Sequence, residues 1–370
     1  MQDRPYFRYS IIELEAVAQE NWSNIAVLEY VANELVFRKK QRAKKLQQKI
    51  HQQIDILQSK TECGSNEGEL YEIFFPQKWI KGVSLDRALK DVGSPYSENY
   101  KNIIFNFPVG SNLILEAGIR ILCIANQLSA DGKNVTFKFD DINVLNYLNL
   151  MEFFIHLDPR VNVIPYRPEY SHRGSAESLV EIGEIVQGKD IGSLPGLLTN
   201  TFCIWAKTSS DSALGLAGFT VFGEMIANVQ EHSDSALSGY AALQVYRPTL
   251  PRYRHYIQIV VSDSGKGIVN TLRPVLNKWY SEYQDLSASA IIGKIFEMGL
   301  SRFGPEAGRG VGLKKSWQQA MKSDSRLVIR QDTCSVTLKH LRSTSQSNFH
   351  EDLVPIRGTH MSLEFYLDRE

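Results

Sequence analysis

Residues 256–267 read Tyr-Ile-Gln-Ile-Val-Val-Ser-Asp-Ser-Gly-Lys-Gly, an apolar strand that runs into a turn. The turn places one carboxylate, Asp263, at the end of the strand, and Gly265 and Gly267 follow it at two-residue steps. Glycine supplies positive φ angles in tight turns and leaves no Cβ in the way of a ligand. The pattern therefore predicts either a tight loop or a site where a flat ring approaches the backbone beside a carboxylate.

A second polar pattern lies upstream, on a predicted helix. Glu224, Asn228 and His232 recur at four-residue steps, so we expect their side chains along one face of that helix. Most of the residues around them are apolar, which indicates a half-buried helix, and buried polar groups need partners. A solvated polar stripe is the alternative interpretation.

A third pattern lies at residues 308–313, which read Gly-Arg-Gly-Val-Gly-Leu and precede a predicted helix over 314–321. Glycines that open a helix expose backbone N–H groups, and together with the positive end of the helix these favour an anion. The segment lacks the spacing of a dinucleotide-binding Gly-x-Gly-x-x-Gly, and the chain has no Gly-x-x-x-x-Gly-Lys-Ser/Thr phosphate loop. A plain loop before a helix is the alternative.

Taken together and in this order, the three patterns resemble the ATP-binding domains of the GHKL ATPases, which share the Bergerat fold. This superfamily includes gyrases, chaperones, histidine kinases and mismatch-repair proteins. Gly358 and Thr359 also match the Gly-Thr that opens a late strand of that fold. The resemblance covers about residues 210–367 and is closest to the histidine-kinase and anti-sigma-factor serine-kinase branch.

The resemblance implies a role for each matched residue. Asp263 would accept a hydrogen bond from the adenine amino group, beside Gly265 and Gly267, and Thr359 would support a water there. Asn228 would hold Mg²⁺ against the triphosphate, and Glu224 would orient or deprotonate the attacking group. The other residues assigned to nucleotide binding are His232, Gly308, Arg309, Gly310, Gly312 and Leu313.

The resemblance also implies a mobile lid over about residues 270–307, in which Gly293, Gly299 and Gly304 are expected to separate short helical pieces. For His232 a structural hydrogen bond is an equal alternative to a role in catalysis. Lys266 and Arg309 are expected either to contact phosphate or to be solvated.

Several functions are compatible with such a site. We favour an ATP-gated switch, in which hydrolysis changes the contacts of the lid with a regulated partner protein or a second copy. A serine/threonine kinase of the anti-sigma type is the alternative. A histidine kinase ranks lower, because His156 and His172 lie in α/β or loop contexts and His51 lies far upstream. A non-hydrolysing binding module would not need the base that Glu224 provides.

The chain before residue 200 predicts further parts of an α/β (α+β) protein. Strands are expected at 102–107, 135–139 and 161–164, and helices at 111–129 and 143–157. This order resembles, in pattern only, the STAS domains of anti-anti-sigma factors, whose phosphorylated hydroxyl follows the equivalent strand. Residues 139–143 read Phe-Asp-Asp-Ile-Asn and carry no hydroxyl, so the resemblance implies a docking or spacer domain.

We therefore expect four regions. These are a helical segment at 1–64, a STAS-like α/β domain at 69–170, a Gly- and Ser-rich linker at 171–200, and a Bergerat-fold ATP-binding domain at 201–370.

Composition restricts the class of protein. The 370 residues include 41 basic and 41 acidic side chains, so the net charge argues against a chain built throughout for nucleic acid or anionic membrane. No apolar run predicts a signal peptide or a membrane span. The four cysteines, Cys63, Cys123, Cys203 and Cys334, lie far apart, which favours buried free thiols in a reducing cytoplasm.

A basic run lies within the helical segment. Seven basic residues and no acidic residue occur between positions 38 and 49, namely Arg38, Lys39, Lys40, Arg42, Lys44, Lys45 and Lys49. A solvated helix face is the simpler interpretation. The alternatives are a contact with nucleic-acid phosphates or a dock for an acidic partner.

Overall fold

The computed structural model describes residue 6 and residues 8–22, 24–38, 40–62, 69–168, 178–190, 192–232, 234–250, 253–302, 304 and 312–367. Contacts divide the chain into two compact units, Met1–Glu69 with Val163–Arg167, and Leu70–Asn162 with Pro168–Glu370. The secondary structure is mixed α/β, as predicted. The predicted middle and ATP-binding domains belong to one unit, and we call residues 70–162 the middle domain and residues 178–367 the C-terminal domain.

The N-terminal region forms three helices, where the sequence predicted one continuous helical segment. They are α1 (Ile11–Glu20), α2 (Ile25–Val36) and α3 (Gln41–Glu62). Ser10 and Glu13 form a capping box at the start of α1, and the Asn24 side chain accepts a hydrogen bond from the Val27 N–H at the start of α2. Such caps favour a new helix start, so the chain breaks here without Gly or Pro.

Most residues of the basic run lie on an exposed face of α3. Ala43, Leu46, Ile50 and Ile54 are buried with residues of α1 and α2. The exposed positions at the start of α3 carry only basic and amide side chains, namely Gln41, Arg42, Lys44, Lys45, Gln48 and Lys49. Arg42 pairs with Glu15, and Arg38 pairs with Glu34.

The middle domain contains a four-stranded sheet in the order β1-β3-β5-β6, in which β3 and β5 are parallel. Its strands are β1 (Glu69–Phe74), β3 (Tyr100–Phe107), β5 (Asn134–Phe139) and β6 (Asn162–Ile164). A second, parallel pair joins β2 (Trp79–Ile80) to β4 (Asn112–Leu113). The three predicted strands are confirmed.

The middle-domain helices are α4 (Gly82–Val92), α5 (Leu115–Ala130), α6 (Ile142–Leu150) and α7 (Phe153–His156). They differ in part from the prediction: α4 was not predicted, and the helix predicted over 111–129 begins only at Leu115, after strand β4. The single helix predicted over 143–157 is wrong, because Glu152 has a φ of +61°, which is outside the helical region, and separates α6 from α7.

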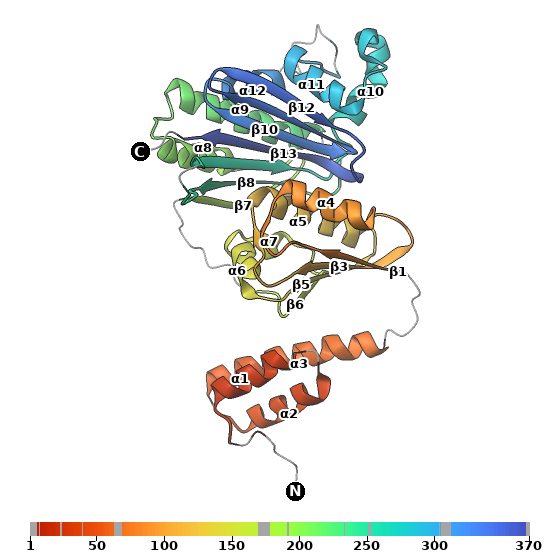
Figure 1. Ribbon diagram of the computed structural model, residues 1–370, viewed down its shortest axis with the longest axis vertical. Coiled ribbons are helices and arrows are strands. Elements are labelled where there is room, and N and C mark those ends of the chain that lie inside the picture. Colours follow the sequence, from red (N-terminus) through yellow and green to blue (C-terminus); the bar gives the residue numbers. More distant parts are fainter. Residues whose placement is uncertain are drawn as a thin grey trace. The chain divides into compact units, whose positions relative to one another are not determined.

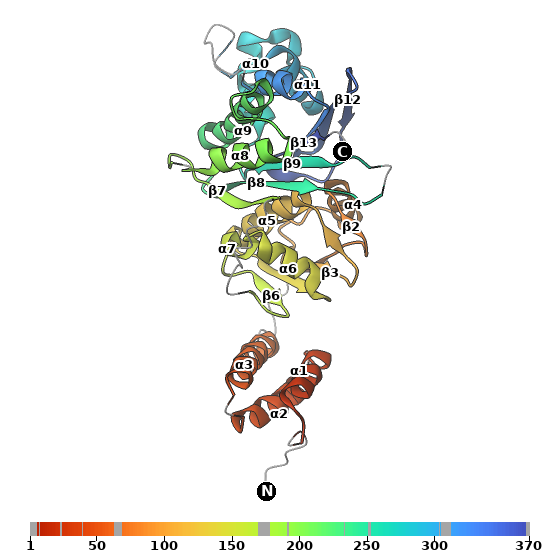
Figure 2. The same cartoon turned by 90° about the vertical axis from the view of Figure 1, so that its left-hand side faces the viewer.

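The C-terminal domain contains a seven-stranded sheet in the order β12-β11-β10-β13-β9-β8-β7, with antiparallel neighbours (Figures 1 and 2). The strands are β7 (Leu179–Ile185), β8 (Gly239–Tyr246), β9 (Tyr256–Ser262), β10 (Ser325–Asp332), β11 (Cys334–Leu341), β12 (Thr344–His350) and β13 (Ile356–Tyr366). The predicted strand before Asp263 is therefore β9, near the centre of the sheet.

The linker predicted over 171–200 is wrong for residues 179–185 and 194–200. Leu179–Ile185 forms the edge strand β7, and Leu194–Trp205 forms helix α8. Leu194 packs closely on Gly183: a Cβ on Gly183 would lie 2.6 Å from the Leu194 Cδ1. Residues 169–177 lie outside the described part of the chain.

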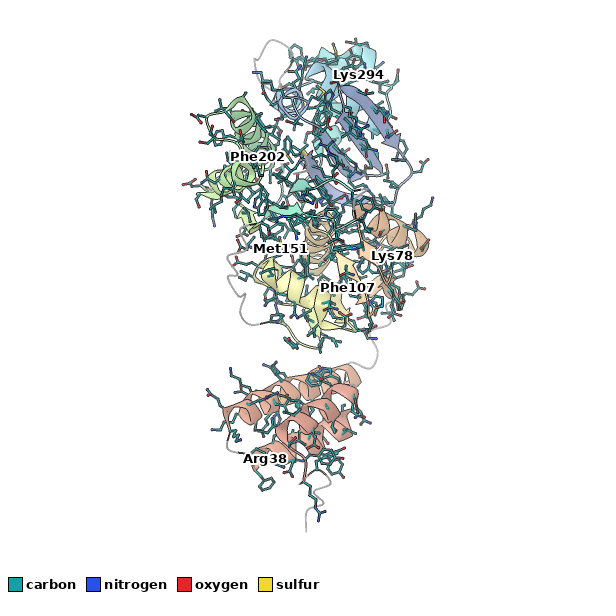
Figure 3. The ribbon with its side chains drawn as sticks, turned by 60° about the vertical axis from the view of Figure 1, so that its left-hand side comes forward. Arg38, Lys78, Phe107, Met151, Phe202 and Lys294 are labelled. Carbon is teal, nitrogen blue, oxygen red and sulfur yellow. The ribbon has the colours of Figure 1, made fainter. Side chains whose placement is uncertain are left out.

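One face of the seven-stranded sheet packs on helices and forms an apolar core. The helices are α8, α9 (Ala213–His232) and α12 (Gly312–Ala320). Of these, α9 and α12 were predicted from the sequence. Ile257, Ile259 and Val261 point to this face from β9. Phe202, labelled in Figure 3, is fully buried here, and its ring contacts Phe222 edge-to-face, whereas Phe107 belongs to the middle domain.

The opposite face of the sheet is covered by the middle domain. Helix α5 lies between the two sheets (Figures 1 and 2) and contacts β8, β9 and β13. All its residues from Leu115 to Ser129 are buried. A helix buried on every side must lie between two packed layers.

The segment predicted as a mobile lid contains α10 (Ile268–Trp279), a short 3-10 turn (Ser281–Tyr283) and α11 (Ala288–Met298). These helices bury apolar side chains, including Leu272, Leu276, Ile291 and Ile295, in the C-terminal core. Movement of the whole segment would therefore expose apolar surface. Gly293 lies inside α11, so the predicted break there is wrong, whereas Gly299 ends α11 with a φ of +79°.

Three of the four cysteines, Cys123, Cys203 and Cys334, are buried free thiols as predicted, and Cys63 lies outside the described residues. Within the described ranges, no helix combines the length and the apolar character needed to cross a membrane.

The two interpretations of the basic run predict different results. If α3 contacts nucleic-acid phosphates, substituting Glu for Lys44, Lys45 and Lys49 should abolish binding to a DNA duplex, measured by fluorescence anisotropy. Wild-type affinity should also fall at least tenfold between about 50 and 200 mM NaCl, because counterions are released.

The control is the same substitution at three exposed lysines of the middle domain, Lys78, Lys81 and Lys90. It changes the net charge by the same amount. Equal loss of binding in both triple variants, or binding that does not respond to salt, would identify the run as a solvated face.

Candidate functional site

Asp263 is a buried carboxylate at the end of β9, with 6% of its surface exposed. Its Oδ1 accepts hydrogen bonds from the backbone N–H of Gly265 at 2.6 Å and of Thr359 at 3.2 Å. The backbone N–H of Asp263 donates to the Thr359 carbonyl at 3.0 Å. The structure thus brings the Asp-x-Gly-x-Gly turn and the Gly-Thr pair, almost 100 residues apart in sequence, into direct contact.

Gly358 makes this contact possible. Its φ is +88°, and a Cβ at this position would lie 1.9 Å from the Asp263 carbonyl oxygen. Any other residue would both strain the backbone and push the two loops apart. The glycine before Thr359 is therefore required by the close approach of the backbones.

Burial raises the pKa of Asp263 to about 6, and the hydrogen bonds from Gly265 and Thr359 only partly oppose this shift. No cation within ion-pair distance of Asp263 is found in the described residues. A buried carboxylate with no cationic partner costs folding free energy when it ionises at neutral pH, and carboxyl groups with such raised pKa values are frequent at functional sites.

Gln331 is a site residue that the sequence analysis missed. It lies at the end of β10 with 1% exposure, and its Oε1 accepts a hydrogen bond from the Ile268 N–H at 2.7 Å. Gly267 has a φ of +81°, and a Cβ there would lie 2.8 Å from the Gln331 Cδ. The Nε2 of Gln331 is buried and has no hydrogen-bond partner among the described residues. The sequence contained one indication of this residue. Leu327 and Ile329 alternate as buried strand residues, and Gln331 places an amide at the next buried position.

Glu224 and Gly312 meet where α9 packs on α12. A Cβ on Gly312 would lie 1.9 Å from the Glu224 Oε2, so a larger residue there would force this carboxylate to move. Leu313, the next residue, is buried in the core. The structure therefore joins the second sequence pattern to the last glycine of the third.

Asn228 lies one turn further along α9 and is half-buried. Its Nδ2 donates to the Glu224 carbonyl at 2.6 Å, and this bond directs the amide so that Oδ1 remains available as a ligand oxygen. Lys266 forms an exposed ion pair with Asp234, just beyond the end of α9, so in this state Lys266 has a carboxylate partner.

Some predicted site residues lie outside the described part of the chain. Gly308, Arg309 and Gly310 are not described, and His232 is described only as the last residue of α9. Among the residues that are described, no cluster of three His, Cys, Asp or Glu side chains could hold a metal ion.

Comparison of the chain with protein-family models, with curated proteins and with solved structures found no match. The interpretation of the site therefore depends on its own geometry.

The raised pKa of Asp263 predicts how stability responds to pH. The carboxyl is protonated in the folded protein up to about pH 6, whereas in the unfolded chain it ionises near the ordinary aspartate pKa of 3.8. The folded state thus binds more protons in this window, and the free energy of unfolding should fall as the pH rises through it.

Asp263→Asn removes this titration and keeps an oxygen that can accept both backbone hydrogen bonds. It should raise the free energy of unfolding at pH 7.5 by up to about 3 kcal/mol, and the gain should vanish near pH 4. Denaturant unfolding at the two pH values measures this. Asp234→Asn, which alters an exposed carboxylate nearby, should give no such gain. A gain for Asp263→Asn that is equal at both pH values would contradict the explanation.

Proposed function

We propose that the C-terminal domain is a Bergerat-fold ATP-binding domain, and that Mg²⁺-dependent ATP hydrolysis in it drives a switch that regulates a partner protein. The observation that carries the proposal is the contact of Asp263 with Thr359 beside Gly267. A buried carboxylate acceptor, glycine backbone and a hydroxyl at one point suit a flat base that has an amino group.

The base would lie against the turn that Gly267 opens, and Asp263 would accept its amino hydrogen. One oxygen of Asp263 is already held by Gly265 and Thr359, which orients the carboxylate before a ligand arrives. Such preorganisation lowers the cost of binding. The buried Nε2 of Gln331, next to this turn, is a hydrogen-bond donor that a bound base could satisfy.

The phosphates would lie toward the start of α12, where the backbone N–H groups of the first turn are not used within the helix. Asn228 suits Mg²⁺, because Mg²⁺ prefers oxygen ligands and keeps most of its waters. When bound, the metal would neutralise charge on the phosphate oxygens.

Glu224 would orient or deprotonate the attacking water. Its carboxylate is held against Gly312 at the start of α12, so it would lie beside the terminal phosphate of a nucleotide bound there. Binding alone would not require a carboxylate at a position where it opposes a polyanion, which supports hydrolysis over a passive site.

A kinase that phosphorylates its own middle domain is less well supported. At the turn where the STAS resemblance places an acceptor hydroxyl, Asp141 caps α6 by accepting from the Asn143 N–H at 2.8 Å and also accepts from the Gly110 N–H. This position therefore serves the local structure. Transfer of phosphate to a separate protein stays an alternative to the switch.

Asp263→Asn should reduce the affinity for Mg·ATP at least a hundredfold, because the amide presents a donor to the amino group of the base. Isothermal titration calorimetry measures this, with circular dichroism to verify folding. Asp91→Asn, which changes an exposed carboxylate of α4 in the middle domain, is the charge-matched control. Undiminished ATP affinity in Asp263→Asn would overturn the assignment of the base site.

A further inference from the structure

The face of the seven-stranded sheet that the middle domain covers is polar. Its strands alternate, so the residues next to the core residues point to this side. The set includes Tyr240, Gln244, Tyr246, Gln258, Ser262, Arg326, Arg330, His360, Ser362 and Glu364. A sheet face of this composition can be buried only against a surface that supplies partners for its polar groups.

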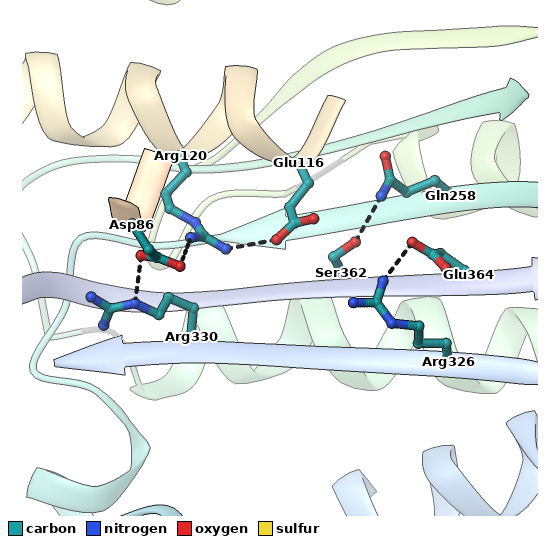
Figure 4. A network of polar contacts seen from close by, with 8 residues as sticks. All are labelled: Asp86, Glu116, Arg120, Gln258, Arg326, Arg330, Ser362 and Glu364. Carbon is teal, nitrogen blue, oxygen red and sulfur yellow. Dashed lines mark hydrogen bonds and ion pairs between the residues drawn. The ribbon is translucent and has the colours of Figure 1, made fainter. Parts of the chain in front are cut away.

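A charge network fixes the middle domain to this face (Figure 4). Asp86 of α4 accepts from Arg330 of β10 at 2.9 Å and from Arg120 of α5 at 3.2 Å. Arg120 also pairs with Glu116 at 2.7 Å. The Arg120 and Arg330 side chains are 2% and 0% exposed, so neither can lose its carboxylates without leaving a buried charge.

At the C-terminal end of α5, Gln127 contacts the candidate nucleotide site directly. Its Nε2 donates to the Ser264 Oγ at 2.8 Å and also lies 3.4 Å from the Arg357 carbonyl oxygen. Ser264 follows Asp263 in the Asp-x-Gly-x-Gly turn, and Arg357 precedes Gly358 and Thr359. One side chain from the middle domain therefore holds both loops that form the proposed base site.

Neighbouring residues of the middle domain orient Gln127 and hold the loop that carries Arg357. The Tyr96 hydroxyl donates to the Gln127 Oε1, which orients the amide. The Arg357 guanidinium pairs with Asp131 at 2.8 Å and lies over the Tyr96 ring, 4.6 Å from its centre. Gln127 is only 1% exposed, so its position depends on how α5 is docked.

The same interface is incompletely satisfied. The Arg120 Nε, the Ser262 Oγ and the His360 Nδ1 are buried and have no hydrogen-bond partner among the described residues. Burial also lowers the pKa of His360 well below its usual value, with Arg120 and Arg330 adding to the shift. Unpaired buried polar atoms weaken an interface, so these three atoms lower the stability of the docked state of α5.

We propose that Gln127 is a positioning residue for the nucleotide, through which the middle domain sets nucleotide affinity. This inference rests on the proposed ATP site. A ligand or partner that shifts α5 would move Asp263 and Thr359 together and weaken binding. By linkage, bound nucleotide would favour the docked position of α5 to the same extent.

The test compares Gln127→Ala with Tyr147→Phe. Tyr147 lies on α6 and donates to the Gln244 Oε1 at 2.6 Å, so its variant loses a hydrogen bond of the same interface, but to β8 and not to the two loops. Gln127→Ala should weaken Mg·ATP affinity about tenfold, the scale of one or two net hydrogen bonds. Tyr147→Phe should leave the affinity within twofold of wild type.

Hydrogen–deuterium exchange without nucleotide is the second readout. Backbone amides of residues 262–268 and 356–360 should exchange faster in Gln127→Ala and at the wild-type rate in Tyr147→Phe. Ser264→Ala removes the acceptor of the Gln127–Ser264 hydrogen bond and leaves α5 unchanged. Its exchange rates should match those of Gln127→Ala.

The outcomes separate the two proposals. Wild-type protein that binds no nucleotide would overturn the proposed function, and the exchange rates would still report whether Gln127 holds the loops. Faster exchange with unchanged affinity would overturn the role of Gln127 in nucleotide positioning. Equal effects of Gln127→Ala and Tyr147→Phe on both readouts would show only general weakening of the interface and would also overturn it.

Discussion

Arg330 carries a positive charge in the interior of the larger unit, and its burial constrains everything packed around it. It is 0% exposed and points away from the apolar core, toward the middle domain. The idealised cost of an uncompensated charge in such a place is many kcal/mol, so a carboxylate must meet it. Asp86 does so from 244 residues upstream, and the same carboxylate holds Arg120 on α5. The middle and C-terminal domains accordingly pack together as one compact unit.

This constraint reaches the candidate site because α5 is both the centre of the interface and the support of two loops. The polar face of the sheet needs α5 for its hydrogen bonds, and the loops that carry Asp263 and Thr359 are held at the end of the same helix by Gln127. On the other side of the sheet, glycines at 267, 312 and 358 allow close approach of groups that a Cβ would separate. The candidate site thus lies between a polar interface and an apolar core, and burial raises the pKa of its one buried carboxyl, Asp263.

Much of the fold could be predicted from local patterns. Helix α9, strand β9 and the start of α12 have strong periodicity or clear turn residues, β5 alternates plainly, and β3 contains a run of apolar residues. Strand β7 was missed because Glu181 and Glu184 interrupt a short apolar run that sits at a sheet edge. The break between α1 and α2 was missed because no Gly or Pro marks it. The new helix start at α2 depends instead on the side-chain cap of Asn24. The contact of Asp263 with Thr359 agrees with the expectation that the Asp-x-Gly-x-Gly turn and the Gly-Thr pair belong to one site. Gln127 and Gln331 could not be found in this way, because their contacts join residues more than 60 positions apart and no local pattern encodes them.

The most direct test of the central claim is turnover of γ-labelled Mg·ATP by the whole chain, with free phosphate separated from protein-bound label. The account predicts free phosphate from the wild type, none from Asn228→Ala, and none from Glu224→Ala although that variant still binds ATP. Release by Glu224→Ala at the wild-type rate would contradict the assigned base. Label transferred to the protein would support a kinase in place of the switch. A wild-type protein that neither forms a product nor binds ATP would contradict the proposed ATP site itself.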